Sequence, residues 1–156
     1  MKVSEAMTGD VLCCAADATL NDAAQVMWER DCGFVPVTER EGGRFVGVVT
    51  DRDLCMAAYT QGRPLHEIPV ATAMARDVVT IKAEDDVARA LDLLRRHQLR
   101  RLPVVDERGE LVGVLSLCDV ARTASRKRAP ESDQLKNKVG QALAEIGRPR
   151  ALGAAG

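Results

Sequence analysis

The sequence predicts a mixed α/β (α+β) fold made of two tandem repeats. Each repeat is ordered strand-helix-strand-strand-helix, and the two are expected to pack about a pseudo-twofold axis through their small sheets. Three observations lead to this prediction: an internal duplication, apolar patterns that alternate between helical and strand periods, and an aliphatic composition. Hydrophobic residues make up 46% of the 156 residues but aromatic residues only 3%, so Val, Leu, Ala and Met must build the core.

The chain repeats itself with an offset of 67 residues. In this register Val3 falls on Val70, and Pro36 falls on Pro103. After Pro36 the first copy carries one extra loop residue, so the offset becomes 66 and Asp53 meets Asp119. A register kept over about 50 residues is the signature of a duplicated structural unit.

Each copy opens with a short strand and a helix. The strands are expected at residues 11–14 and 78–81. Asp17 or Thr19 supplies the N-cap oxygen of the first helix, and Asp85 or Asp86 that of its counterpart. Apolar residues then recur at helical spacing in both copies.

A hairpin and a second helix complete each copy. Residues 34–37 and 101–105 are β-rich, polar turns follow, and residues 45–49 and 111–115 return. The proline in the first strand of each hairpin indicates an edge position or an interrupted ladder. The second helices begin near Asp51 and Leu117.

The domain boundaries follow from the repeat. We expect repeat 1 at residues 1–60, a linker at 61–69, repeat 2 at 70–126 and a tail at 127–156. One three-stranded repeat is too small to bury both faces of its sheet, so the copies are expected to pack together.

The tail carries one apolar stripe that predicts an amphipathic helix at about residues 131–146. Residues 122–150 contain eight basic and three acidic residues. The stripe is expected to pack on the module or on a dimer mate, and docking to a target protein or an acidic surface is the alternative. The stripe consists of Leu135, Val139, Ala142, Leu143 and Ile146.

Composition also argues against several functions. The net charge of −1 and the few aromatic rings make nucleic-acid binding an unfavoured function. No apolar run approaches the roughly 20 residues of a membrane span, and the start lacks a signal core, so a cytoplasmic protein is expected. Five cysteines without CxxC spacing predict no metal site, and buried thiols are favoured over redox sensing at Cys13 and Cys14. No catalytic constellation emerges, so neither an enzyme nor a catalytic cofactor is expected.

Several motifs occur once per copy and in the same order. Ala-Met stands near each repeat start, and Val-Pro-Val or Leu-Pro-Val-Val forms a strand. Gly-Val-Val-Thr-x-x-Asp and Gly-Val-Leu-Ser-x-x-Asp follow. Together they resemble the CBS-domain pair (Bateman module) proteins of the stand-alone bacterial type, over roughly residues 1–126.

The resemblance implies a non-catalytic regulatory sensor. Such a module binds an adenosine-containing nucleotide, AMP, ADP, ATP or another adenosyl compound, in the clefts between the repeats, and regulates a partner protein not named by the sequence. The alternative is a structural dimerisation module with vestigial clefts. A homodimer is expected through helix faces with short side chains: Ala23, Ala24, Met27, Leu54, Ala57, Ala58, Leu91 and Leu94.

The resemblance also implies the site residues. Asp53 and Asp119 would bond ribose hydroxyls, with Thr50 and Ser116 beside them, because a carboxylate accepts hydrogen bonds from both members of a cis-diol. The same Thr/Ser-x-x-Asp pattern is also a helix capping box, and both roles stay open. The adenine slot would involve Cys13, Cys14, Val35, Pro36, Thr80, Ile81, Leu102 and Pro103.

Basic residues are the candidates for the phosphates. Arg100 and Arg101 precede the Leu-Pro strand, and Arg52 lies at a helix start, where backbone N–H groups favour anions. The first copy has Gly33 and Phe34 in place of the arginine pair, so the two clefts are not equivalent. A solvated turn is the alternative role of Arg100 and Arg101.

Overall fold

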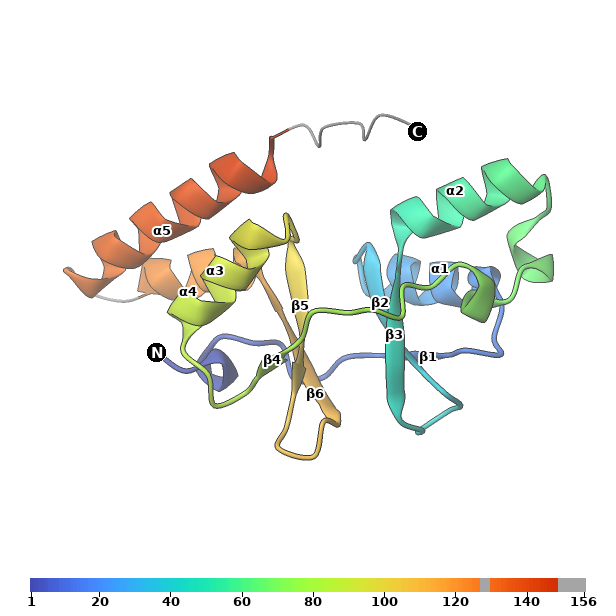
Figure 1. The fold of residues 1–156 in the computed structure, drawn as a ribbon, viewed down its shortest axis with the longest axis horizontal. Helices are drawn as coiled ribbons and strands as arrows, with labels where there is room; N and C mark the ends of the chain where they lie inside the picture. The colour runs from blue at the N-terminus through green and yellow to red at the C-terminus, as the bar shows by residue number, and fades with distance from the viewer. Residues whose placement is uncertain (127–129, 149–156) are drawn as a thin grey trace. The chain divides into compact units, whose positions relative to one another are not determined.

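A computed structural model describes residues 1–126 and 130–148 of the chain. It confirms the predicted fold class: within these residues lie two small three-stranded sheets and five α-helices (Figure 1). The sheets have the strand orders β1-β2-β3 and β4-β5-β6. The hairpin strands of each copy are therefore neighbours, and the short first strand borders the middle one.

The two copies contain the same elements in the same order. The first copy consists of β1 (Cys14–Ala15), α1 (Leu20–Glu29), β2 (Phe34–Thr38), β3 (Phe45–Thr50) and α2 (Asp51–Gln61). The second copy consists of β4 (Ile81–Lys82), α3 (Val87–Arg96), β5 (Arg101–Val105), β6 (Leu111–Ser116) and α4 (Leu117–Arg126). A further helix, α5 (Glu131–Ile146), follows them.

Side-chain caps determine where α1 and α3 begin. Thr19 caps α1 in a reciprocal box, since the Asp22 carboxylate accepts from the Thr19 N–H at 2.8 Å. Hydrogen bonds from the Thr19 backbone and hydroxyl hold the pKa of Asp22 below its ordinary value. Asp86 caps α3 by accepting from the Ala88 N–H at 2.7 Å. Of the two residues considered for each helix, the one next to the helix is the cap.

The first strand of each copy is shorter than expected and begins later. β1 covers Cys14–Ala15 instead of residues 11–14, and β4 covers Ile81–Lys82 instead of 78–81. In the first copy the parallel ladder joins only Cys14 to Val37 and Ala15 to Thr38. A β-rich run predicts extended backbone, but the ladder exists only where a partner strand lies alongside.

The prolines lie in middle strands, so the predicted edge position is wrong. β2 and β5 are the central strands of their sheets. Pro36 pairs with Val48 of β3, whereas the ladder to β1 starts only at Val37. The missing proline N–H therefore costs no hydrogen bond on the β1 side.

The segments that precede the two copies are exchanged between them. The Val3 N–H donates to the Asp85 carbonyl at 2.9 Å, and the Val70 N–H donates to the Ala18 carbonyl at 2.8 Å. Thr8 exchanges two hydrogen bonds with Val114, as Ala75 does with Val48. We call residues 1–9 and 70–79 the two arms. Each of these hydrogen bonds of one arm has its repeat equivalent in the other arm, and each arm binds the other copy.

Two compact units result from this exchange. The first-copy unit contains Asp10–Val79 with Val105–Val112, and the second-copy unit contains Met1–Gly9, Thr80–Val104 and the described residues from Gly113 onward. Glycine lets each arm approach its hairpin closely. A Cβ at Gly47 would lie 2.4 Å from the Ala75 carbonyl oxygen, and one at Gly113 would lie 2.7 Å from that of Thr8.

Aliphatic side chains fill both cores, as the composition predicts. In the first-copy unit the buried residues include Leu20, Val35 and Val49, and Ile68 of the expected linker is fully buried as well. The Ile68 carbonyl accepts from the Leu20 N–H at 2.8 Å, so the end of that segment is part of the unit. In the second-copy unit Leu94, Leu102 and Leu115 are fully buried.

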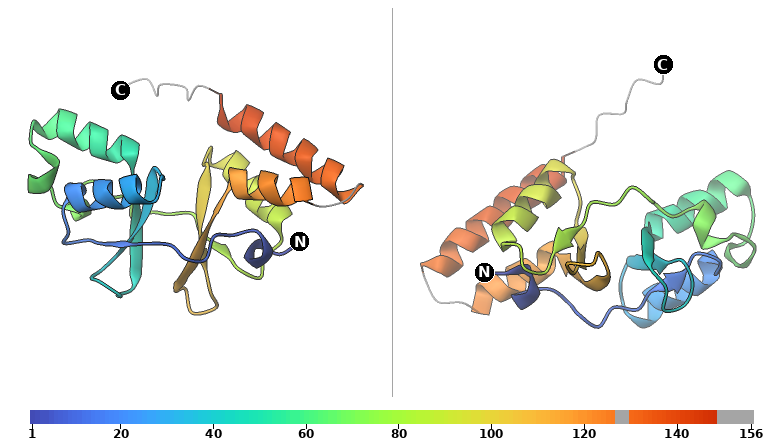
Figure 2. Two further views of the ribbon diagram at one scale, coloured as in Figure 1. Left: turned by 180° about the vertical axis from the view of Figure 1, so that it is seen from behind. Right: turned by 60° about the horizontal axis from the view of Figure 1, so that its bottom comes forward.

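The helices pack on the sheets within each unit. α1 and α2 lie side by side in the first-copy unit, and α5 runs along α3 and α4 in the second-copy unit (Figures 1 and 2). Ala142 and Ile146 of α5 are buried, whereas Leu143 is 60% exposed and does not share the predicted stripe's inward side. Among the described residues, no helix has the length and apolar character needed to cross a membrane.

Candidate functional site

In the first copy the predicted ribose residues meet at the junction of β3 and α2. The Thr50 N–H and hydroxyl both donate to Asp53 Oδ2, at 2.8 and 2.7 Å. The Asp53 N–H returns a hydrogen bond to the Thr50 hydroxyl at 3.3 Å. This is the capping box that the motif allows, and it holds the half-buried carboxylate in one orientation.

The second copy repeats the arrangement at the junction of β6 and α4. Ser116 donates to Asp119 Oδ2 from its N–H at 2.9 Å and from its hydroxyl at 2.5 Å. Asp119 is buried, and Arg122 donates to its other oxygen, Oδ1, at 3.2 Å. The two sites therefore differ at the carboxylate oxygen that faces away from the cap.

That second oxygen decides what the site can still bind. In both copies Oδ2 is used by the cap. Asp53 Oδ1 has no hydrogen-bond partner among the described residues, and a carboxylate oxygen accepts two donors. In the second copy a ligand would share Asp119 Oδ1 with Arg122, whose side chain is 62% exposed and able to move. Capping and ligand binding are thus compatible uses of the same side chain.

The residues beside these junctions give the two copies opposite charge. At the first junction the Asp51 N–H donates to the Gly33 carbonyl at 3.3 Å, and at the second Leu117 donates to Arg100 at 3.1 Å. A Cβ at Gly33 would lie 2.4 Å from Asp51 Oδ2, so the glycine makes room for this carboxylate. The second copy instead presents the exposed Arg100 and the half-buried Arg101.

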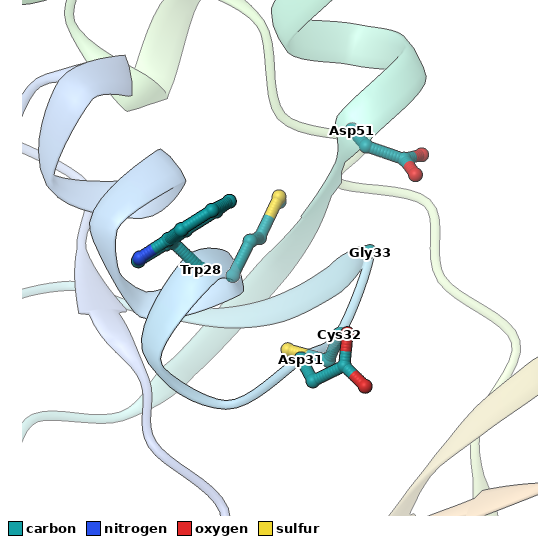
Figure 3. Close-up of a pocket in the computed structure, with 6 residues that line it drawn as sticks. Trp28, Asp31, Cys32, Gly33 and Asp51 are labelled. Atoms are coloured by element: carbon teal, nitrogen blue, oxygen red, sulfur yellow. The ribbon is translucent and has the colours of Figure 1, made fainter.

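A pocket of about 500 Å³ lies next to the first junction (Figure 3). This pocket was not predicted from the sequence, because its residues come from the end of α1, the following turn and the start of α2. Asp31 adopts a left-handed backbone with φ of 47°, as its repeat equivalent Gln98 does with 51°. The lining residues are Met27, Trp28, Asp31, Cys32, Gly33 and Asp51.

Most residues of the predicted adenine slot are buried. Val35 and Leu102 have no exposed surface, Pro36 and Pro103 are buried beside them, and Ile81 is buried too. Phe34 of β2 lies opposite Thr50 of β3, so the strand of the slot borders the ribose motif. Cys13 and Thr80, each in its own unit, are half-buried.

The thiols near this region are poor nucleophiles. Burial raises the pKa of Cys13, and burial together with the neighbouring Cys13 raises the pKa of Cys14 to about 11. A thiol in this state stays protonated at neutral pH, which disfavours redox sensing here. Over the part of the chain that the structure describes, no three His, Cys, Asp or Glu residues are grouped to hold a metal ion.

The remaining phosphate candidate, Arg52, is exposed in the first turn of α2. Its N–H donates to Asp51 Oδ1 at 2.8 Å, so an acidic side chain already accepts from the backbone at this helix start. Arg52 therefore differs from Arg100 and Arg101, which have no carboxylate at the equivalent positions of their own junction.

The duplicated fold with a carboxylate box at each hairpin-helix junction defines a protein of two tandem α/β repeats. The CBS domain model matches residues 3–59 and 67–126, and the chain belongs to the CBS-domain family. YlbB, an uncharacterized protein of Bacillus subtilis (strain 168), is 30% identical over 145 residues, which are 93% of this chain and 90% of YlbB.

Solved structures include members with bound ligands. CBSX2 in complex with AMP has a TM-score of 0.70 and 27% identity, over 80% of this chain and 96% of CBSX2. The CBS domain pair of MJ0100, in complex with 5′-methylthioadenosine and S-adenosyl-L-methionine, has a TM-score of 0.72. It is 20% identical over 82% of this chain and 98% of the other, which shows the shared fold.

Proposed function

We propose that this protein is a non-catalytic regulatory module that binds an adenosine-containing nucleotide. Asp53 and Asp119 would accept the ribose hydroxyls. The observation that carries the proposal is the oriented carboxylate at each junction: the cap uses Oδ2, while Oδ1 of Asp53 has no partner among the described residues and Oδ1 of Asp119 pairs only with the exposed Arg122. The presence of AMP in CBSX2 supports an adenosyl ligand for a chain of this family.

The remaining contacts follow from the same arrangement. The base would lie against the backbone of β2 or β5, near Pro36 or Pro103. Arg100 and Arg101 would contact phosphate, since they supply the positive charge at the second junction. Such a sensor acts in the cytoplasm, where adenine nucleotides are pooled, and transmits its occupancy to a regulated protein.

An assembly module with vestigial clefts is the second candidate. It is favoured by one observation: the capping boxes account for Asp53 and Asp119 without any ligand, and Arg122 already pairs with Asp119. This candidate predicts that the two aspartates affect stability alone.

Calorimetry with AMP on the double variant Asp53→Ala/Asp119→Ala separates the two candidates. Hydrogen bonds to a charged group contribute about 1.5–3 kcal/mol, so affinity should fall roughly ten- to a hundredfold. Asp22→Ala is the matched control, because it removes the same kind of box from the start of α1, which is part of neither junction. Each variant should also lose about 1 kcal/mol of stability per cap, so titrations belong below all melting points.

Unchanged affinity in the folded double variant would show that the aspartates are caps only. The companion variant Arg100→Ala tests the phosphate contact. It should weaken AMP binding and leave adenosine binding as it is. Equal losses for both ligands would mean that Arg100 supports the fold and not the phosphate.

A further inference from the structure

The carboxylate of the second copy has few acceptor positions left for a ligand. A carboxylate offers about four such positions, two on each oxygen. Asp119 Oδ2 already accepts from the N–H and from the hydroxyl of Ser116. Oδ1 accepts from Arg122 Nη1 at 3.2 Å. One position on Oδ1 therefore remains, whereas the cis-diol of a ribose presents two hydroxyl donors.

The carboxylate of the first copy keeps both positions on that oxygen. Thr50 uses Asp53 Oδ2 in the same way, and Asp53 Oδ1 has no partner among the described residues. In the register of the duplication the residue equivalent to Arg122 is Met56, whose thioether cannot donate a hydrogen bond. The two copies thus carry the same capping box and differ at the residue three positions further along the helix.

The ion pair between Arg122 and Asp119 is able to open. The two residues are three apart in α4, which places them on one face of the helix. The side chain of Arg122 is 62% exposed, and ion pairs with a solvent-exposed partner are weak. A ribose that uses both positions of Oδ1 must displace the guanidinium. The displaced guanidinium can then bind a phosphate, which it contacts through two parallel hydrogen bonds.

Further positive charge lies beside the second junction. The Leu117 N–H at the start of α4 donates to the Arg100 carbonyl at 3.1 Å, and Arg101 follows as the first residue of β5. Their equivalents in the first copy, Gly33 and Phe34, are uncharged. The second junction therefore favours an anionic ligand more strongly than the first.

We propose that Arg122 determines which adenosyl ligand the second-copy site accepts. A ligand of this site must supply an anionic group for the displaced Arg122 as well as two ribose hydroxyls. A nucleoside phosphate meets both requirements, whereas an uncharged adenosyl compound such as adenosine meets only one. The first-copy site, with Met56 in place of the arginine, accepts both kinds of ligand. This inference rests on the proposed function, because it requires that the two carboxylates bind ribose.

Calorimetry on single-site variants tests the proposal. Asp53→Ala leaves the second-copy site, and Asp119→Ala leaves the first-copy site. In the Asp53→Ala background, Arg122→Met installs the residue of the first copy. It should tighten adenosine binding roughly two- to fivefold, the range expected for a solvent-exposed ion pair, and should not tighten AMP binding. Arg126→Met is the matched control, since it removes the same charge from the exposed end of α4 and should leave adenosine binding unchanged.

The reverse exchange and the salt dependence give two further readouts. In the Asp119→Ala background, Met56→Arg places a guanidinium three residues after Asp53 and should weaken adenosine binding by a similar factor. Salt screens the ion pair but not a contact with the uncharged adenosine. An increase of NaCl from about 0.05 to about 0.5 M should therefore tighten adenosine binding to Asp53→Ala. This gain should disappear once Arg122 is replaced by Met, which a purely structural role of Arg122 would not explain.

Unchanged adenosine binding in an Arg122→Met variant that is folded by circular dichroism would overturn the proposal. An equal gain for AMP and adenosine would do so too, since Arg122 would then not select for phosphate. The same holds if Asp53→Ala binds neither ligand and Arg122→Met restores neither. Failure of the proposed function has a different signature, which is full AMP binding by Asp53→Ala/Asp119→Ala with Arg122 in place.

Discussion

Asp53 and Asp119 each cap a helix with one carboxylate oxygen and would use the other oxygen for the proposed ligand. The oxygen that accepts from Thr50 or Ser116 begins a helix, and the same bonds orient the other oxygen. Preorientation lowers the entropy that a ligand must remove on binding. Without a ligand, Asp119 Oδ1 is already paired with Arg122, whereas Asp53 Oδ1 has no partner among the described residues.

The cysteines give a residue-scale prediction with a defined pH dependence. At pH 8 a thiol-specific reagent should modify the exposed Cys55 and Cys118 rapidly, and Cys14 only on unfolding, because its pKa is raised to about 11. Cys55→Ser/Cys118→Ser should remove the rapid phase. A rapid phase that persists in this variant would show that Cys13, Cys14 or Cys32 is accessible and reactive.

The same shift affects stability at high pH. Burial raises the pKa of the folded Cys14 thiol to about 11, whereas the unfolded thiol loses its proton near the ordinary pKa of 9.0. This stabilisation is therefore complete below pH 9 and is lost as pH rises toward 11. Urea denaturation of the wild type and Cys14→Ala across this range should show a smaller pH-dependent loss in the variant.

At the scale of elements, each exchanged arm pairs with the β-hairpin of the other copy and belongs to that copy's compact unit. Thr8 pairs with Val114 and Ala75 with Val48, at the glycines of the two β-hairpins. The close approach of the backbones excludes a side chain at Gly47 and Gly113. These glycines therefore act through space, since neither has a positive φ.

Replacing glycine by alanine should lower the stability at some positions of the chain and raise it at another. Gly47→Ala and Gly113→Ala should each destabilise by about 1–3 kcal/mol, because the new methyl group overlaps backbone. Gly140→Ala, in the middle of α5 with no atom within 4 Å of its Cβ, should stabilise by up to about 1 kcal/mol. Thermal denaturation of the three variants measures both effects. A neutral Gly47→Ala would mean that the Ala75 arm detaches at little cost.

Removal of the segment after Arg128 tests the role of α5; Arg128 itself lies outside the described residues. The truncated chain should melt cooperatively, because the sheet-facing core around Leu94 and Leu102 is retained. Its melting temperature should fall, since Ala142 and Ile146 no longer cover α3 and α4. Light scattering should show a larger assembly once that face is uncovered. An unfolded truncated chain would place α5 in the core, and an unchanged mass would argue against its covering role.

For the whole molecule, a ligand that binds only the folded chain should stabilise it. At a concentration of one hundred times Kd the gain is about 2.7 kcal/mol. At roughly 2–4 °C per kcal/mol for a chain of this size, AMP should raise Tm by about 5–11 °C. Asp22→Ala should keep the shift and Asp53→Ala/Asp119→Ala should lose most of it. No shift with any adenine nucleotide would favour the vestigial module.

The geometry of the two Thr/Ser-x-x-Asp boxes could be predicted because the motif is local. Thr50 and Asp53 are three residues apart at a strand-helix junction, where a cap requires this spacing, and the duplication presents it twice. The pocket at Trp28 and Asp31 could not be anticipated, because its walls come from three segments whose meeting depends on packing. The burial of Val35 and Leu102 is likewise a property of the packed sheet.

By itself the sequence determined the repeat, the periods of helices and strands, the capping boxes and the family, since each depends on residues close together in the chain. Only the tertiary structure decided that each arm binds the other copy, that β1 and β4 shorten to two residues, and that α5 closes one helix pair while Trp28 and Tyr59 stay exposed. These features depend on which distant segments compete for the same backbone groups and apolar surfaces. Both copies present nearly the same local patterns, so local patterns cannot decide which partner each surface receives.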